Sequence, residues 1–404
     1  MEEDHLYTLN VSEGHCKAVY AHIISRHGIR NPGAKDIRKM TELQKKIIEH
    51  MDSDIFPFIE RWTNRYFSDE EKLLTENGEL EQFLLGRKFA KYFRSLLAND
   101  LDNLNFVVTS KQRAKTSGAF FYKGLSDYFG EHYEFRPHLE DTLLRFHDIC
   151  EHYKYLVDVN RSFLSEYYSF MSGDYVRNVT ESVSQRLGVS KKLIASADVR
   201  LLFHLCAFEM ANYNESDWCD LMNDEERKVI EYSADLKQYL KKAYGHRLMG
   251  EMSCPLVKNI FENLDYVVAA ELKGEKHSPA TFMFGHAETL APLFAGLGLF
   301  KDILPLTANN YQFLQNRSFR SSWILPFSSN LAFILYHCKA NDLVKKPPEQ
   351  FPLRLVMNGK PVSFPVCNKT ICPYRTVRES YTVQVDNCNF ADICQLRKDI
   401  HSEL

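Results

Sequence analysis

The chain has 404 residues, of which 45% are hydrophobic and 25% charged, and its formal net charge is −3. A composition of this kind is typical of a globular protein with one large domain or two interlocked domains. Because the net charge is close to zero, the sequence shows no excess of basic residues of the kind that binds nucleic acid, and we expect no nucleic-acid partner. No run of about 18 apolar residues occurs, which predicts that the chain has no membrane span.

The most informative stretch lies near the start of the chain, where a nearly uncharged segment runs into a cluster of charge. Residues 17–25 are rich in β-branched and small side chains, which predicts a buried strand. Arg26, His27 and Arg30 follow at once. A helix is then predicted by apolar residues at spacings of three and four: Ile37, Met40, Leu43, Ile47 and Met51. Open α/β sheets place their ligand sites at such junctions.

The side chains of this loop suit the binding and attack of a phosphate. Arg26 and Arg30 supply two planar donor forks that keep their charge at physiological pH. Like-charge repulsion should lower the pKa of His27 between them, which keeps the ring neutral and nucleophilic. On composition alone, a basic turn that contains one histidine fits the loop equally well.

Two later junctions repeat the pattern. Residues 105–110 form a short apolar run that opens onto Arg113. A cation at the positive end of a helix is unfavourable unless an anion joins it, so a ligand-binding role is favoured over a solvated helix start. Residues 281–285 predict a third strand, which His286 and Glu288 follow. A lone histidine at a strand end is more often structural, but a third junction of one type favours a shared site.

The spelling of the first loop, Arg-His-Gly-x-Arg-x-Pro, resembles the signature of the histidine acid phosphatases, branch 2 of the histidine phosphatase superfamily. The resemblance implies that His27 becomes phosphorylated and that Arg26, Arg30 and Arg113 hold the transferring phosphate together with His286. It also implies an α/β fold, with an open and mostly parallel sheet, helices on both of its faces, and a mainly helical inserted domain.

One departure from the common pattern narrows the resemblance. Most members carry His-Asp at the third junction, whereas His286-Ala287-Glu288 resembles the variant of the multiple inositol polyphosphate phosphatases. Glu288 would then be the proton donor, and the implied substrates are inositol polyphosphates such as phytate. The segment after the first loop also resembles that subfamily, which makes Lys35 and Arg38 candidates for binding phosphates that are not being hydrolysed.

Other functions stay open from the sequence. The chain could be a general acid phosphatase or a 2,3-bisphosphoglycerate phosphatase. A lumenal protein that binds phosphate without turnover is a third possibility, against which the set of His27, Arg113 and Glu288 argues. We expect no metal and no cofactor, because arginines would neutralise the charge of the phosphate.

Several features point to the secretory pathway. The ten cysteines include four in the tail, Cys367, Cys372, Cys388 and Cys394, and no tight Cys-x-x-Cys pair occurs. Disulfides are therefore favoured over zinc. Glycosylation sequons lie at Asn10, Asn178, Asn214, Asn316 and Asn368. The terminal residues His401-Ser402-Glu403-Leu404 resemble the address of the endoplasmic-reticulum retrieval receptor. We expect a protein of the endoplasmic-reticulum lumen or a secreted one, and infer that a leader was removed before the acidic start Met1-Glu-Glu-Asp-His.

The remaining patterns suggest how the chain is organised. Residues 131–250 lack strand-like alternation and predict a helical insertion, with its clearest periods at 191–210 and 224–249, whereas 15–130 and 251–404 would form the α/β core. Within the insertion, a Cys206–Cys219 bridge is plausible. Thr75 precedes a predicted helix whose buried side is marked by Leu80, Phe83, Leu84 and Phe89. A strand is expected at 330–336 and a two-residue hairpin at Asn358-Gly359.

Overall fold

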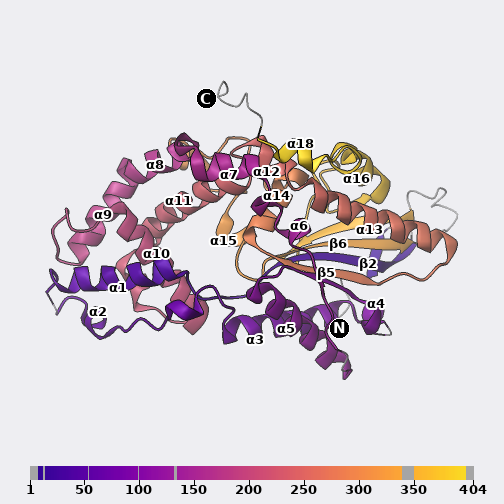
Figure 1. Ribbon diagram of the computed structural model, residues 1–404, viewed down its shortest axis with the longest axis horizontal. Coiled ribbons are helices and arrows are strands. Elements are labelled where there is room, and N and C mark those ends of the chain that lie inside the picture. Colours follow the sequence, from indigo (N-terminus) through magenta and orange to yellow (C-terminus); the bar gives the residue numbers. More distant parts are fainter. Residues whose placement is uncertain are drawn as a thin grey trace.

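A mixed β-sheet lies in one half of the molecule (Figure 1). The structure is a computed structural model that describes residues 8–11, 14–52, 54–98, 100–131, 134–338 and 350–396. Its strands run in the order β4-β3-β5-β2-β6-β7-β8, with β1 paired to β2 and β9 paired to β7. The strands span Thr8–Val11 (β1), Gly14–Arg26 (β2), Asn105–Val108 (β3), His138–Leu139 (β4), Ala280–Gly285 (β5), Asn330–Cys338 (β6), Pro352–Met357 (β7), Lys360–Val362 (β8) and Ile371–Pro373 (β9).

The three strands of the predicted junctions are parallel neighbours. β3 pairs with β5, placing Val108 opposite Phe284, and β5 pairs with β2, placing Gly285 opposite Arg26. From β2 onward the sheet continues in antiparallel pairs through β6, β7 and β8. The carboxyl ends of β3, β5 and β2 therefore meet at one edge of the sheet, which is where an α/β fold places a ligand.

Helices cover both faces of the sheet, which confirms the predicted fold class (Figure 1). On one face lie α3 (Glu76–Tyr92) and α5 (Gln112–Phe129), and on the other lie α13 (Cys254–Lys273), α14 (Ala287–Leu297) and α16 (Tyr374–Ser380). Between α5 and the sheet the Phe121 ring packs 5.0 Å from that of Phe282, which in turn stacks 5.1 Å from Phe106. Burial of large aromatic side chains on both faces explains why the central strands are apolar throughout.

The other half of the molecule is helical (Figure 1). It contains α8 (Ser165–Ser172), α9 (Asp174–Arg186), α10 (Ser196–Tyr213) and α11 (Asp224–Lys242), all from the predicted insertion. It also contains α1 (Ala34–Ile48) and α2 (Pro57–Arg61), and Lys46 of α1 forms an ion pair of 2.7 Å with Asp198 of α10. The first strand-loop-helix unit is thus shared between the two halves, and the domain limits given above stay a prediction.

Two helices of this half differ from the predicted periods. The helix expected at 191–210 begins only at Ser196, because the Asp198 carboxylate accepts the Ala195 N–H at 3.0 Å and caps the helix there. The period at 224–249 is two helices, α11 and α12 (Arg247–Glu251). The chain turns between them, where the Gly245 N–H donates to the Tyr239 carbonyl at 3.0 Å.

The predicted buried side of α3 is wrong in part. Leu80 and Leu84 are each 54% exposed, and the buried stripe is instead formed by Gly78, Gln82, Gly86, Phe89 and Ala90. The cause is the close approach of α3 to α5, because a Cβ on Gly86 would lie 2.1 Å from the Phe121 carbonyl oxygen. A face built of glycine carries no hydrophobic signal, so the leucines beside it marked the wrong side.

All ten cysteines form disulfides, and the predicted Cys206–Cys219 bridge is among them. The other pairs are Cys16–Cys338, Cys150–Cys394, Cys254–Cys388 and Cys367–Cys372. Each cysteine of the tail is therefore disulfide-bonded and offers no thiolate to bind zinc. Five disulfides are typical of a protein that folds in an oxidising compartment.

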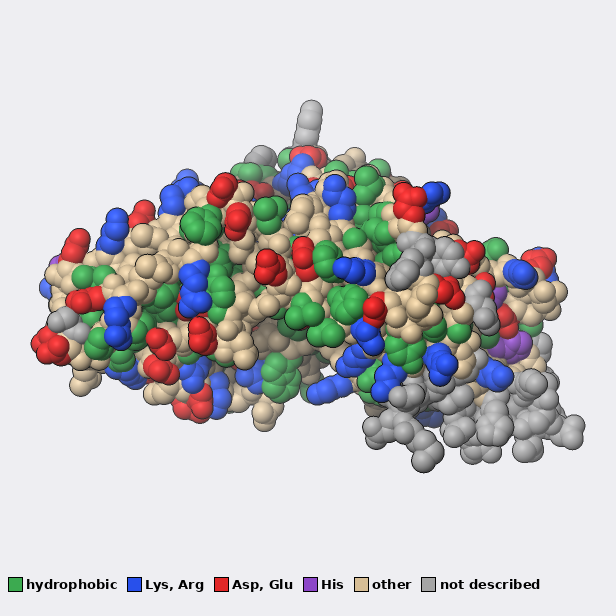
Figure 2. All heavy atoms as spheres, turned by 90° about the horizontal axis from the view of Figure 1, so that it is seen from below, with side chains coloured by type: hydrophobic (Ala, Val, Ile, Leu, Met, Phe, Trp, Pro, Cys, Tyr) green, Lys and Arg blue, Asp and Glu red, His purple; other side chains and the backbone are tan. Residues whose placement is uncertain are grey.

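The shorter helices complete the description: Arg94–Leu97 (α4), Asp141–Leu144 (α6), Glu151–Lys154 (α7), Ser321–Ile324 (α15), Thr382–Asp386 (α17) and Phe390–Cys394 (α18). Among the residues described, no helix is both long and apolar enough to cross a membrane. On the face seen in Figure 2, lysine and arginine side chains are interspersed with carboxylates, in keeping with the near-neutral net charge.

The features tied to secretion have varied places in the structure. Four sequon asparagines are exposed: Asn178, Asn214, Asn316 and Asn368. Asn10 belongs to β1, and both the terminal His401-Ser402-Glu403-Leu404 and the acidic start lie outside the described residues. Glycosylation at these positions stays a prediction.

Candidate active site

The two predicted histidines lie side by side at the carboxyl edge of the parallel strands. The rings of His27, after β2, and His286, after β5, have centroids 5.4 Å apart. Thr109, the residue after β3, places its hydroxyl 3.1 Å from Nε2 of His286. The charge of Arg113 acts on His286 and on Arg30, so the second junction, after β3, reaches the same place.

His27 is held by its backbone and presents one nitrogen for chemistry. Its N–H donates to the Gly285 carbonyl at 3.1 Å, and its own carbonyl accepts the Ser328 N–H at 3.1 Å. Nδ1 lies 2.9 Å from the Gly28 carbonyl, which can only accept, so Nδ1 carries the proton and Nε2 carries the lone pair. Burial, and then the charge of Arg26, lower the pKa of His27 well below its usual value. The ring is therefore neutral and nucleophilic, as predicted.

The two arginines of the loop are buried beside it. Arg26 donates from its guanidinium to the Leu325 carbonyl, and its Cζ lies 4.4 Å from the centre of the Phe327 ring. Burial and then the neighbouring Arg30 lower the pKa of Arg26 to about 10, and burial and then Arg113 lower that of Arg30 to about 10. Both side chains remain cationic at physiological pH, and Arg113 is a third like charge that acts on both of them.

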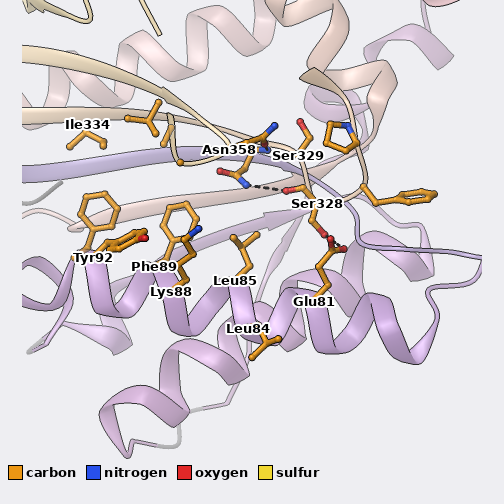
Figure 3. A pocket seen from close by; sticks show the side chains of 17 residues that line it. Glu81, Leu84, Leu85, Lys88, Phe89, Tyr92, Ser328, Ser329, Ile334 and Asn358 are labelled. Atoms are coloured by element: carbon orange, nitrogen blue, oxygen red, sulfur yellow. Dashed lines mark hydrogen bonds between the residues drawn. The ribbon is translucent and has the colours of Figure 1, made fainter. Parts of the chain in front are cut away.

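A short segment before β6, residues 325–330, clamps the loop from one side, and we call it the strap. Besides Phe327, it contributes the Ser329 carbonyl, which accepts the Arg26 N–H at 2.7 Å. Ser328 has a φ of 57°, a conformation that is strained for a residue with a side chain. Its hydroxyl donates to Glu81 of α3 (Figure 3). The same hydroxyl accepts from Gln82 at 2.7 Å. The sequence offered no signal for the strap.

A cavity of about 420 Å³ lies between the strap, α3 and the sheet (Figure 3). Its walls are mostly apolar, and its lining includes Leu84, Leu85, Phe89, Tyr92, Ile334 and Val356. Lys88 is the basic side chain among its lining residues, and none of the predicted catalytic residues belongs to it. A multiply charged anion needs several cations, so this cavity is not the active site.

The segment before α3 supports the loop from the other side. The Thr75 N–H donates to the Ile29 carbonyl at 3.0 Å, while the Thr75 hydroxyl accepts the Gly78 N–H at 3.3 Å and caps α3. Gly78 lies so close to the loop that a Cβ there would be 2.1 Å from the Ile29 carbonyl oxygen. Thr75 and Gly78 therefore hold the start of α3 against the nucleophile loop.

Replacing Gly78 with alanine should destabilise the protein by about 1–3 kcal/mol, because the added methyl group would force the nucleophile loop and α3 apart. The measurement is the free energy of unfolding from urea denaturation. Gly33→Ala is the matched control, since its Cβ would meet the flexible end of Lys72 at 3.3 Å and should cost little. Equal stability of the two variants would contradict the proposed contact.

Three buried nitrogens at the site have no hydrogen-bond partner among the described residues. They are Nε of Arg26, Nε of Arg113 and Nδ1 of His286, one from each junction. Buried polar groups are nearly always satisfied, so these nitrogens need a ligand or water. Burial and then Arg113 lower the pKa of His286 to about 3, which leaves the ring neutral. The arrangement fits a tetrahedral anion in contact with all three junctions.

Glu288, the predicted proton donor, lies in the first turn of α14 and is ionised. Its Oε1 is 2.8 Å from Nζ of Lys242, the last residue of α11. Burial would raise the pKa of Glu288, but the charge and hydrogen bond of Lys242 outweigh it and hold the pKa well below the usual value. Glu288 also acts electrostatically on Arg30 and Arg113. The carboxylate is thus at the site, although in the unprotonated form.

Comparison with known proteins settles the family. The model of the histidine phosphatase superfamily (branch 2) matches residues 19–358. The chain belongs to this family. Multiple inositol polyphosphate phosphatase 1 of Gallus gallus is 34% identical, covering 95% of this chain and 85% of the relative. The Homo sapiens protein of the same name is 32% identical, covering 96% and 83%.

Solved structures show the same fold at low identity. The Bifidobacterium longum multiple inositol polyphosphate phosphatase in complex with inositol hexasulfate has a TM-score of 0.74 and 16% identity, covering 97% of this chain and 95% of that one. The phytase from D. castellii has a TM-score of 0.75 and 17% identity, covering 94% and 82%. The family match and the curated relatives identify the chain as a phosphatase of the histidine acid type.

Lys35 and Arg38 lie at the start of α1 with exposed side chains, and the charge of Arg38 acts on Glu71. Asp36 between them acts on Arg30, which places the first turn of α1 near the site of this phosphatase. A role for Lys35 and Arg38 in binding further phosphates stays a prediction.

Several residues near the site were missed by sequence reasoning. The charge of Arg145 acts on Arg113 and His286, and His147 next to it acts on Glu288. Lys242 pairs with Glu288. All three belong to the predicted insertion, where no motif marks them. A further group, Arg200, Lys237 and Lys241, lies on α10 and α11, and we call it the cationic cluster.

Proposed function

We propose that this phosphatase hydrolyses inositol polyphosphates such as phytate through a phosphohistidine at His27. The observation that carries the proposal is the set of unpartnered buried nitrogens of Arg26, Arg113 and His286 beside a neutral His27. Such a set provides donors for the oxygens of one phosphate and a nucleophile beside its phosphorus. The names of the curated relatives supply the substrate class.

In the first step, Arg26, Arg30, Arg113 and His286 bind one phosphate and stabilise the charge on its equatorial oxygens. The Nε2 lone pair of His27 attacks phosphorus in line, and the bond from phosphorus to the bridging oxygen breaks with its electron pair on that oxygen. Glu288, once protonated, gives its proton to the departing hydroxyl. In the second step, Glu288 takes a proton from a water molecule, and the oxygen of that water attacks phosphorus. The phosphorus–nitrogen bond breaks with its electron pair on Nε2 of His27, and phosphate is released.

The cationic cluster supports a substrate with several phosphates. Burial and then Arg200 and Lys241 lower the pKa of Lys237 to about 8. Burial and then Lys242 lower the pKa of Lys241. Like charges this close disfavour one another, and an anion that binds among them would relieve the repulsion. A general acid phosphatase or a 2,3-bisphosphoglycerate phosphatase acts on substrates with fewer phosphates and needs fewer cations to bind them.

The test is the time course of inositol products from phytate with the purified full chain. We expect successive release of phosphate, unchanged by a metal chelator, and a higher kcat/KM for phytate than for an aryl phosphate. Loss of activity on chelation would contradict the metal-free mechanism. An equal kcat/KM for the two substrates would favour the general acid phosphatase.

Replacing Lys237 with glutamine should raise KM for phytate by about 10-fold, because about 1.4 kcal/mol of charge pairing is lost. KM for an aryl phosphate should stay the same. Lys228→Gln is the matched control, because Lys228 lies on the same helix but pairs with Glu225 at the surface. Equal KM values for phytate in the two variants would contradict a role for the cationic cluster in binding.

We infer that the protein works in the lumen of the endoplasmic reticulum and is retrieved through the tetrapeptide His401-Ser402-Glu403-Leu404. The five disulfides support an oxidising compartment. Removal of these four residues should then release the protein into the culture medium, and unchanged retention would refute the inference.

A further inference from the structure

We propose that Lys242 couples the binding of a second phosphate group to the protonation of Glu288, so that turnover favours substrates with neighbouring phosphates. The inference rests on the proposed function and deepens it. Lys242 is a positioning and specificity residue in this scheme, and Glu288 remains the group that exchanges a proton with the substrate.

The ion pair joins the two halves of the molecule at the site. Lys242 ends α11 in the helical half, whereas Glu288 lies in the first turn of α14, directly after the sheet. The Lys242 side chain is 13% exposed and that of Glu288 is 37% exposed. The Glu288 side chain is therefore the more exposed member of the pair, whereas the Lys242 ammonium is largely enclosed and in contact with the carboxylate.

Glu288 is a carboxylate among many cations. The cations that face it come from three elements: Lys241 and Lys242 on α11, Arg113 on α5, and Arg26 and Arg30 on the nucleophile loop. The neutral titratable groups near it are His147 after α6, His286 before α14 and Tyr153 on α7. Of these groups, Lys242 makes the direct contact with the carboxylate, at 2.8 Å.

This contact conflicts with the chemistry expected of Glu288. A carboxylate paired with an ammonium holds no proton, so it is unable to protonate a leaving alkoxide. A second phosphate of the substrate is a stronger partner for Lys242 than a single carboxylate, because it offers up to two negative charges. Once Lys242 turns to that phosphate, Glu288 loses its partner and faces new negative charge, and both changes favour its protonated form.

The protons and bonds balance without a further reactant. Glu288 takes its proton from a hydronium ion of the solvent, and the proton that it takes from the hydrolytic water in the second step returns to the solvent. The proton moves to the bridging oxygen as the phosphorus–oxygen bond breaks and the bond from phosphorus to Nε2 of His27 forms. A monophosphate occupies the arginines and leaves Lys242 paired with Glu288, so its alkoxide departs with a poorer acid beside it.

The experiment compares Lys242→Met with the wild type on phytate and on glycerol 2-phosphate, an alkyl monophosphate. Removing the ammonium raises the pKa of Glu288, so the alkaline limb of kcat against pH for the monophosphate should move upward by about one unit. The kcat for the monophosphate at pH 7 should rise severalfold. For phytate, KM should rise and kcat should not. The ratio of kcat/KM for phytate to that for the monophosphate should fall by about 10-fold or more.

Two further variants keep the test decisive. Lys242→Arg restores the cation and should return the wild-type ratio, which separates charge from packing. Lys228→Met, at the surface of the same helix, should change neither the ratio of kcat/KM for phytate to that for the monophosphate nor the pH profile of kcat. If Lys242→Met lowers kcat/KM equally for both substrates and leaves the alkaline limb in place, the proposed coupling is wrong. If the wild type does not hydrolyse phytate at all, the proposed function itself fails, so the two failures are distinguishable.

Discussion

Replacing His27 with asparagine should reduce phosphate release from phytate by about 10⁴-fold or more, because no other described side chain at the site offers a neutral nitrogen in the same place. The covalent intermediate should vanish with it. Brief exposure of the wild type to phytate labelled in its phosphates, quenched in base, should leave label on the protein, and the variant should retain none.

His50→Asn is the control for this experiment. His50 is exposed just after α1, and its Nδ1 lies 3.0 Å from the Lys46 carbonyl, so its loss should change neither rate nor labelling. The variant His27→Asn should still bind an inositol polyphosphate through its arginines. Turnover that survives in the variant would exclude the phosphohistidine and leave a different nucleophile to be found.

Replacing Glu288 with glutamine should lower kcat on phytate by about 10²- to 10⁴-fold, the usual contribution of a general acid. An alkoxide leaves poorly without a proton, whereas a nitrophenolate leaves readily. With an aryl phosphate the variant should therefore release a burst of one equivalent of nitrophenol, followed by slow turnover, because the second step lacks its base. Rapid-mixing absorbance measures both phases.

The control is Glu251→Gln, an exposed carboxylate at the end of α12, which should behave as the wild type with both substrates. A variant Glu288→Gln that loses equal activity on phytate and on the aryl ester, with no burst, would contradict the assignment. The residue would then act in substrate binding alone.

The junctions of the sheet could be predicted because each is a local pattern. An apolar strand, a charged loop and an amphipathic helix are read within about 30 residues, and the parallel pairing of β3, β5 and β2 brings their ends to one edge. The buried side of α3 was predicted wrongly at Leu80 and Leu84, since the packed face is made of glycine and glutamine.

The second group of site residues depends on tertiary contacts that no short segment records. Lys242 and Glu288 belong to different halves of the molecule, and their pairing follows from how α11 packs on α14. Phe327 is a single aromatic residue in the strap, and its place against Arg26 depends on the sheet. Arg145 follows the short helix α6 without any motif.

The route of the chain from the nucleophile loop into α1 limits how the molecule can move. Arg30 is fixed on the sheet side by its bridge to Leu74, whereas α1 is fixed to α10 in the helical half. Residues 31–33 join Arg30 to α1, and they are themselves bonded to the segment before α3, because the Asn31 N–H donates to the Leu73 carbonyl at 2.9 Å and the Pro32 carbonyl accepts the Lys72 N–H at 3.1 Å. A rotation of the helical half against the sheet would therefore have to break these bonds, or else it would shift the nucleophile loop.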